Sequence, residues 1–192
     1  MKSIAMLVDN EFVMDKRVYR EAKTLSDNDF NLILYAVKRN DLPENEMIDG
    51  IKLKRIFNKE IFDAKNKKYH LQAAVSIAQT KPDIIHCHDW TMLHIGKLVK
   101  DILPDVILIY DSHELFSSYP IHYSSNKISI LIKTWLVRKY EIWLERNDAK
   151  HIDYLITVSQ SIANYLEKIF RLKNKPMLVR NFAEMEFITE RK

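Results

Sequence analysis

The residues best suited to chemistry come at the end of one short apolar run. Residues 83–90 read Asp-Ile-Ile-His-Cys-His-Asp-Trp, so two imidazoles, a carboxylate and an indole follow an apolar stretch. Imidazole and carboxylate groups can hydrogen-bond the hydroxyl groups of a ligand. The pattern is typical of a buried strand that carries polar side chains to the edge of a sheet.

Two other apolar runs end in the same way. Residues 4–8 run into Asp9 and Asn10, and residues 106–110 run into the sequence Asp-Ser-His-Glu at positions 111–114. In an open α/β sheet, ligands bind beyond the carboxyl ends of the strands. Three strands with polar ends therefore predict one shared crevice.

Apolar runs alternate along the chain with stretches of helical period, which is the pattern of a parallel sheet covered by helices. We expect strands near residues 3–8, 31–37, 51–56, 83–87, 106–111, 154–158 and 177–180. Helices are expected over 69–79, 92–103 and 128–147, and also after Asp15 and Ser159, which would cap them. The prediction is an α/β fold: a single doubly wound Rossmann-like domain with a mostly parallel sheet of about seven strands and helices on both faces.

The composition is that of an ordinary globular protein. Of the 192 residues, 47% are hydrophobic and 29% are charged. No apolar run approaches the ~20 residues of a membrane span, and the N-terminal run meets polar residues too soon for a secretory signal. We therefore expect a cytoplasmic protein. The net charge of +4 is too small to indicate binding to nucleic acid.

Cys87 is the only cysteine, which excludes an internal disulfide. Its flanking histidines suggest zinc, but a second thiolate is missing. We predict that Cys87 is a small buried strand residue, and we expect no metal site.

Gly50 and Gly96 are the only two glycines, and neither lies in the first turn from strand to helix. A dinucleotide fold of the ordinary kind needs a Gly-x-Gly-x-x-Gly turn there, and a P-loop needs Gly-x-x-x-x-Gly-Lys. The sequence therefore predicts the doubly wound fold without its commonest cofactor.

Five blocks of residues have an order and spacing that are more specific than any one block. They cover 15–22, 83–90, 110–116, 153–159 and 179–182, and they read DKRVYREA, DIIHCHDW, YDSHELF, DYLITVS and VRNF. Together they resemble the N-terminal half of family 4 glycosyltransferases of the GT-B fold. The resemblance covers nearly the whole chain.

The resemblance implies retaining transfer of a sugar from a nucleotide-sugar donor to a glycan or lipid-linked acceptor, without a metal or other cofactor. It implies a cleft between two Rossmann-like domains, of which the N-terminal one mainly carries the acceptor. Residues 1–182 would form that domain, and 183–192 would begin a linker to a C-terminal donor-binding domain that this chain lacks. We therefore expect an incomplete enzyme that is inactive alone.

The resemblance also assigns roles to single residues. His88 is the expected catalytic residue, because the family places this histidine beside the donor sugar. Its role would be to orient and hydrogen-bond the sugar near the reacting carbon. His86 is expected on the other side of the strand or deeper in the sheet, as a structural residue.

The other strand ends and the first helix receive binding roles. Asp111, His113 and Glu114 would bind hydroxyl groups of the acceptor, although Asp111 or Ser112 could instead tie down its own loop by local hydrogen bonds. Arg17 could meet a phosphate at the start of the first helix, but pairing with Glu21 at i,i+4 explains it equally well. The residues assigned to the donor are Asp15, Arg17 and Asp89.

Residues 117–133, which include basic and aromatic side chains, resemble the region with which family 4 enzymes meet a lipid-linked acceptor. This suggests peripheral contact with the inner face of a membrane. In the helix that follows, Trp135, Tyr140 and Trp143 recur at helical spacing and are expected mainly in the core. Two other functions stay open. The chain could be a non-catalytic acceptor-binding or assembly half that pairs with a separate donor-binding subunit, or a GT-B-like nucleotide-sugar epimerase relative.

Overall fold

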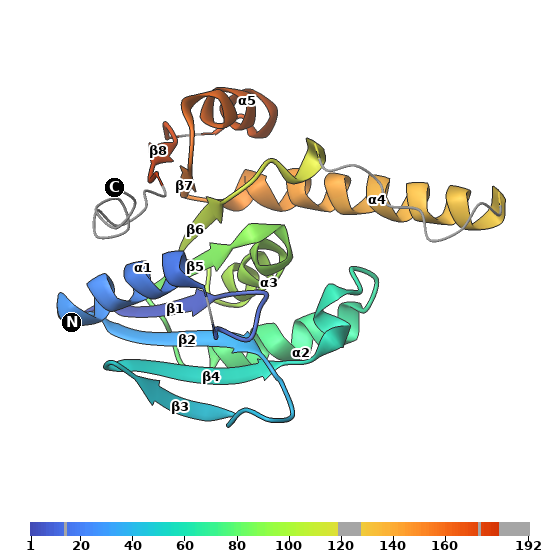
Figure 1. Ribbon diagram of the computed structural model, residues 1–192. Coiled ribbons are helices and arrows are strands. Elements are labelled where there is room, and N and C mark those ends of the chain that lie inside the picture. The colour runs from blue at the N-terminus through green and yellow to red at the C-terminus, as the bar shows by residue number, and fades with distance from the viewer. Residues whose placement is uncertain (14, 119–127, 173, 181–192) are drawn as a thin grey trace, which may run out of the picture.

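The fold is a single parallel-rich sheet with helices on both faces, shown in Figure 1 as a computed structural model. The structure describes residues 1–13, 15–118, 128–172 and 174–180. Residues 183–192 and most of 117–133, which carry the predicted linker and acceptor region, lie outside the described part.

The strands are β1 (Ser3–Leu7), β2 (Asn31–Val37), β3 (Asn45–Ile48), β4 (Ile51–Phe57), β5 (Ile84–His88), β6 (Ile107–Ser112), β7 (Tyr154–Thr157) and β8 (Met177–Leu178). The α-helices are α1 (Lys16–Asp27), α2 (Lys67–Ala78), α3 (Asp89–Ile102), α4 (Ile128–Asp148) and α5 (Gln160–Phe170).

The strand order is β3-β4-β2-β1-β5-β6-β7-β8, and every neighbouring pair is parallel except β3 with β4. The predicted fold class is confirmed, and each of the seven predicted strands is present. The sequence analysis missed β3, a four-residue edge strand that returns through a two-residue turn. In that turn Asp49 and Gly50 both have positive φ, at 48° and 88°. An Asp-Gly pair with positive φ is the strongest short-range signal of a hairpin.

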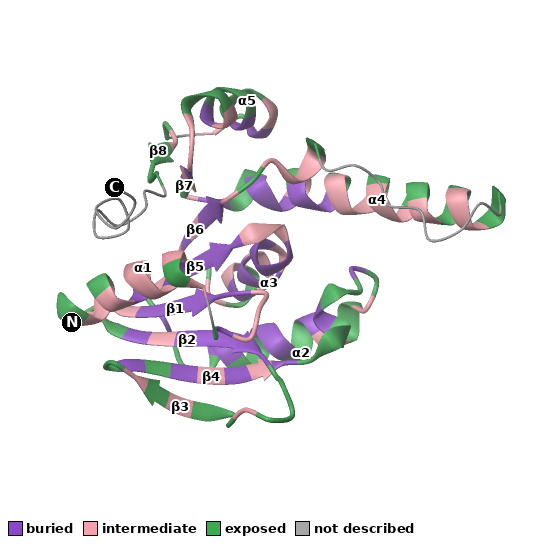
Figure 2. Ribbon diagram, viewed as in Figure 1, coloured by how far each residue is buried: buried purple, intermediate pink, exposed green. Residues whose placement is uncertain are grey.

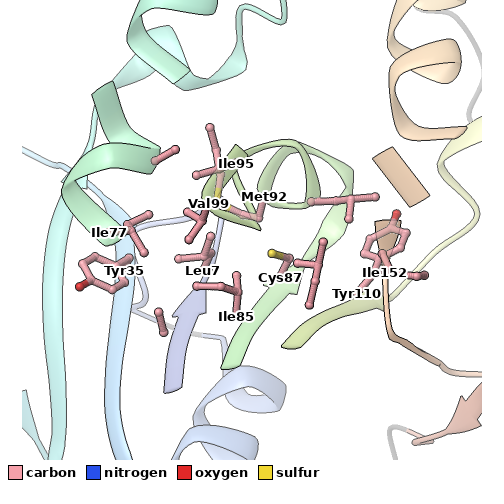
Figure 3. Close-up of a cluster of buried hydrophobic side chains, with 14 of the residues drawn as sticks. Leu7, Tyr35, Ile77, Ile85, Cys87, Met92, Ile95, Val99, Tyr110 and Ile152 are labelled. Carbon is pink, nitrogen blue, oxygen red and sulfur yellow. The ribbon is translucent and has the colours of Figure 1, made fainter. Parts of the chain in front are cut away.

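The larger core lies between the sheet and helices α2, α3 and α5. Figure 3 shows the part of this core near α2 and α3. Cys87 of β5 points into it and is fully buried, as predicted. Gly96 of α3 lies directly against this thiol, and a Cβ at Gly96 would come within 2.3 Å of Cys87 Sγ. The glycine therefore allows α3 to approach the centre of the sheet.

The opposite face of the sheet carries a smaller core, to which α1 alone among the described helices contributes. Val18 and Ala22 of α1 are fully buried there. Asp15 caps this helix as predicted, because its carboxylate accepts a hydrogen bond from the Val18 amide at 3.1 Å. Ser159 caps α5 in the same way. The α1 helix thus covers the face of the sheet opposite to α2, α3 and α5.

Helix α4 projects from the body, and only its C-terminal end is buried (Figures 1 and 2). The hydroxyl of Tyr110 donates a hydrogen bond to Glu145 at 2.9 Å, and this contact fastens that end to β6. Trp135 is 45% exposed and Trp143 58% exposed, so the expectation that both belong to the core was wrong. Their helical spacing is real, but it marks a face that the described part of the chain leaves open.

Candidate functional site

The polar ends of β5 and β6, two of the three strands predicted to share a crevice, come together, and α1 joins them from the next layer. His88 and Asp111 are register partners in the parallel pair β5 and β6, so their side chains leave the sheet on the same face. Helix α1 packs over that face and adds Arg17 and Glu21. The carboxyl ends of two strands and the first turns of one helix therefore build a single polar cluster.

Arg17 connects the helix to the sheet through two carboxylates. Its Nη2 donates to both oxygens of Asp111, at 2.8 and 2.9 Å, and its Nε donates to Glu21 at 3.1 Å. The Asp111 side chain is fully buried and that of Arg17 is 10% exposed. The predicted i,i+4 pair is thus present, but it is half of a larger network.

Burial alone would raise the pKa of Asp111. A hydrogen bond from His113 and electrostatic attraction to that imidazole nevertheless hold the pKa of Asp111 below its usual range. Asp111 is therefore an ionised carboxylate inside the protein. The Asp111 carboxylate bonds Arg17 and not its own loop. Ser112 is the residue that holds the loop, because the Ser112 hydroxyl donates to the Glu114 carbonyl at 2.9 Å.

His88 lies at the centre of the polar cluster and is 2% exposed. Its Nδ1 is 3.0 Å from Nε2 of His113, and its Nε2 is 3.9 Å from Oε2 of Glu21. Burial lowers the pKa of His88 well below its ordinary value, so the imidazole is neutral. A neutral ring has one nitrogen that donates and one that accepts.

Of the two placements predicted for His86, the other side of the strand was wrong, and the position deeper in the sheet is the one observed. Residues two apart in a strand share a face, so His86 points to the same side as His88, and their ring centroids are 4.5 Å apart. Burial lowers the pKa of His86 to about 4. The polar cluster therefore holds a second neutral imidazole that the sequence analysis left out.

His113 and Asp89 form the more open edge of the polar cluster, with side chains 20% and 36% exposed. Nδ1 of His113 lies 3.8 Å from the Asp89 carboxylate, whose pKa burial raises to about 6. Asp89 also has a positive φ of 62° at the start of α3, a conformation that aspartate adopts more readily than most residues. These two side chains can meet a ligand without rearrangement of the layer beneath.

The other two predicted site residues lie apart from this arrangement. Asp15 uses its carboxylate to cap α1 and to accept a hydrogen bond from the Asn10 side chain at 2.9 Å. Glu114 is exposed. The sequence analysis missed Glu21 and His86 as members, although Glu21 follows Arg17 by one helical turn and His86 precedes His88 by two strand positions.

The fold and the site define a Rossmann-like α/β domain with its polar groups at the carboxyl ends of neighbouring strands, where such sheets bind ligands. A family model described as Glycosyltransferase Family 4 matches residues 14–187, and the chain therefore belongs to this family. The predicted resemblance is confirmed. No curated protein sequence matches the chain.

Solved structures with the same fold share little sequence with this chain. Two structures of sucrose-phosphate synthase from Thermosynechococcus elongatus each superpose with a TM-score of 0.66, at 12% and 13% identity. They match 98% and 97% of this chain, and 94% and 49% of their own chains. The UDP-GlcNAc 2-epimerase from Methanocaldococcus jannaschii gives a TM-score of 0.55 at 16% identity, over 93% of this chain and 45% of its own. The chain thus spans about half the length of the longer sucrose-phosphate synthase structure and of the epimerase.

Proposed function

We propose that this chain is the N-terminal, acceptor-side half of a retaining glycosyltransferase. It would act with a C-terminal donor-binding domain on a nucleotide-sugar donor and a glycan or lipid-linked acceptor, with no metal required for the transfer. The observation that carries the proposal is the family match over residues 14–187, together with the polar cluster at the ends of β5 and β6. On its own the chain would be inactive.

His88 is the proposed catalytic residue, with the role of orienting the donor sugar by a hydrogen bond near the reacting carbon. Because its side chain is 2% exposed and its Nδ1 faces His113, contact with a sugar requires His113 to turn aside. A neutral imidazole suits this role, because it can accept as well as donate a hydrogen bond.

The binding roles follow from exposure and charge. His113, Asp111 and Glu114 are the proposed acceptor-binding residues, of which His113 and Glu114 are accessible and Asp111 acts from beneath through His113. The donor side would take Asp15, Arg17 and Asp89. Arg17 already pairs with two carboxylates, so a donor phosphate would have to compete with Asp111 for it.

The test compares the 192-residue chain with the protein encoded by its complete reading frame. Release of nucleoside diphosphate from a panel of UDP- and GDP-sugars is measured for each, and for His88→Ala in the longer protein. We expect turnover in the longer protein alone, with a loss of at least tenfold, about 1.4 kcal/mol of barrier, in the variant. His151→Asn, which changes an exposed histidine, is the matched control.

Two results would contradict this proposal. Turnover by the 192-residue chain at ordinary enzyme rates would mean that no second half is needed. Unchanged turnover in His88→Ala would remove that residue from the mechanism.

The alternative of a non-catalytic half that pairs with a separate donor-binding subunit is supported by one observation. Met177, Leu178 and Val179 in and beside β8 are exposed apolar side chains at the edge of the sheet where the described chain ends. A reading frame without a second α/β domain would favour this alternative over a single-chain enzyme.

Conversion of a nucleotide sugar to its epimer without release of nucleoside diphosphate would favour the other alternative, a relative of the nucleotide-sugar epimerases.

Membrane contact at the inner face is proposed on the evidence of α4. Of the described helices, none is long and apolar enough to span a bilayer. Yet α4 exposes large apolar side chains beside Lys133 and Lys139, a mixture that suits the surface of an anionic membrane. These side chains are Ile128, Ile132, Trp135, Leu136 and Trp143.

Sedimentation with anionic phospholipid vesicles at low salt tests this contact. The wild-type chain should pellet with the vesicles, and the double variant Trp135→Ala/Trp143→Ala should stay largely in solution because it lacks two interfacial anchors. Tyr165→Ala on α5, an exposed aromatic elsewhere, is the control. Equal pelleting of all three proteins, or none by the wild type, would rule out α4 as the contact.

A further inference from the structure

Three buried polar atoms beneath the edge of the site have no hydrogen-bond partner among the described residues. They are Oε2 of Glu21, Nε2 of His86 and Nε2 of His88. Buried polar atoms nearly always have a hydrogen-bond partner in the protein, because an atom that has lost its hydrogen bonds to water and gained none destabilises the folded state. Three such atoms from α1 and β5 in one place therefore call for a physical explanation.

The three atoms face one another and a fourth one. His88 Nε2 is 3.9 Å from Glu21 Oε2, and His86 Nε2 is 4.0 Å from Asp111 Oδ2. All four ligand atoms lie within 4.8 Å of one another. We call Glu21, His86, His88 and Asp111 the buried tetrad.

Arg17 and His113 pair only part of the tetrad. Arg17 donates to one oxygen of Glu21 and to both oxygens of Asp111, and Nε2 of His113 lies 3.4 Å from Asp111. The second oxygen of Glu21 and the facing nitrogens of both histidines stay unpaired. Imidazole nitrogens and carboxylate oxygens are the side-chain atoms that bind zinc in proteins.

We propose that the buried tetrad binds one divalent transition-metal ion of the zinc class. Two imidazole nitrogens and two carboxylate oxygens suit Zn²⁺, and they also accept Co²⁺. The ion would satisfy the three unpaired atoms at once. Cys87 takes no part, because it points into the core on the opposite face.

The dimensions fit after a small contraction. An ion at the centre of the tetrad would lie within roughly 3 Å of every ligand atom, compared with ~2.0–2.2 Å in zinc sites. Each side chain would thus have to move inward by at most about 1 Å, which rotation of the two imidazoles and of Glu21 can supply. A mainly apolar pocket of about 380 Å³ has Glu21 and His86 among its lining residues and so adjoins the tetrad.

This site goes beyond the proposed transfer reaction, for which no metal is required. The ion would join α1 to β5 and β6 and would occupy Nε2 of His88. Its binding therefore depends on the tetrad alone and is measurable without any sugar substrate.

The experiment titrates the chelator-treated chain with Co²⁺ and Zn²⁺. We expect one ion per chain by equilibrium dialysis and metal analysis, a visible Co²⁺ absorption band that Zn²⁺ abolishes, and a higher Tm with Zn²⁺. His86→Ala and Glu21→Gln should each weaken binding at least tenfold, since the first removes a ligand nitrogen and the second replaces a carboxylate by a neutral amide, which is a poor ligand for Zn²⁺. His151→Asn, on the surface, should bind as the wild type does.

Glu21→Gln keeps the shape of its side chain and serves as the decisive variant if His86→Ala does not fold, as judged by circular dichroism. The proposal is overturned if the wild type retains no Zn²⁺ and shows no Co²⁺ band. It is also overturned if Glu21→Gln binds as tightly as the wild type, or if His151→Asn loses the ion, because the site would then lie elsewhere.

Discussion

Arg17 shows how far the chemistry of one residue depends on a distant neighbour. The sequence offers a phosphate at the helix start or Glu21 at i,i+4 as its partner, and the second of these is present. Asp111, 94 positions away, holds the same guanidinium through both of its oxygens. An arginine whose side chain is only 10% exposed and has two carboxylate partners is a fixed element of the site, so its sequence position alone says little about its ligand.

Gly96 is the residue whose replacement we expect to be most informative for packing. In Gly96→Ala the new Cβ would meet Cys87 Sγ at 2.3 Å and Leu108 Cδ1 at 2.8 Å, so α3 must shift from the sheet. Overpacking of this kind costs about 1–3 kcal/mol, to be measured as the free energy of unfolding in denaturant.

A double variant checks the cause of that loss. Cys87→Ala removes the sulfur atom, so Gly96→Ala should cost less in the Cys87→Ala background than in the wild type. If the cost of Gly96→Ala is the same in both backgrounds, the contact with the thiol is not what makes glycine necessary.

Among the elements, α4 departs furthest from its sequence pattern. Its apolar spacing predicted a core helix, yet the buried residues Leu144, Glu145 and Asp148 all lie in its last turns. Two of them are acids: Glu145 contacts the buried Tyr110, and Asp148 contacts the half-buried His94. The helix is therefore held at one end by polar contacts, which periodicity of apolar residues cannot predict.

The contact of α4 with the sheet should make stability depend on pH through Glu145. Burial, the largest cause, raises the pKa of Glu145 from 4.5 to about 7. Tyr110, Arg138 and Arg146 lower it in part, and Asp89 raises it slightly. Between these two pH values the folded protein keeps a proton that the unfolded chain has lost. The contribution of Glu145 therefore falls as pH rises from about 4.5 to about 7.

Glu145→Gln isolates this effect, because the amide oxygen can still accept the hydrogen bond from Tyr110. The free energy of unfolding of the wild type relative to the variant should fall across that pH range, by at most about 3 kcal/mol. Urea denaturation at a series of pH values measures it, with the exposed Glu167→Gln as control. A difference that stays constant or rises with pH would show that Glu145 is not the titrating group.

For the whole molecule, regular periodicity made the fold predictable. Seven strands, both capped helices and the meeting of the strand ends followed from apolar runs and their polar ends. The edge strand β3 did not, because four residues with two polar side chains carry almost no strand signal, although Asp49 and Gly50 mark the hairpin. The site was predictable in its location. The i,i+4 pair of Arg17 with Glu21 was predictable as well. The contacts of α1 with β5 and β6 were not, because they join residues some 70 to 94 positions apart.

The position of β1 in the sheet has a consequence for synthesis on the ribosome. In the folded sheet β1 pairs with β2 on one side and with β5 on the other, where Ile4 and Ile84 are register partners. At roughly 5–20 residues per second, the 51 residues between the ends of β2 and β5, positions 37 and 88, take several seconds to make. Throughout that interval β1 lacks its partner on the β5 side and is an open edge of the nascent chain. In the finished protein the same strand is one of the two central strands of the sheet.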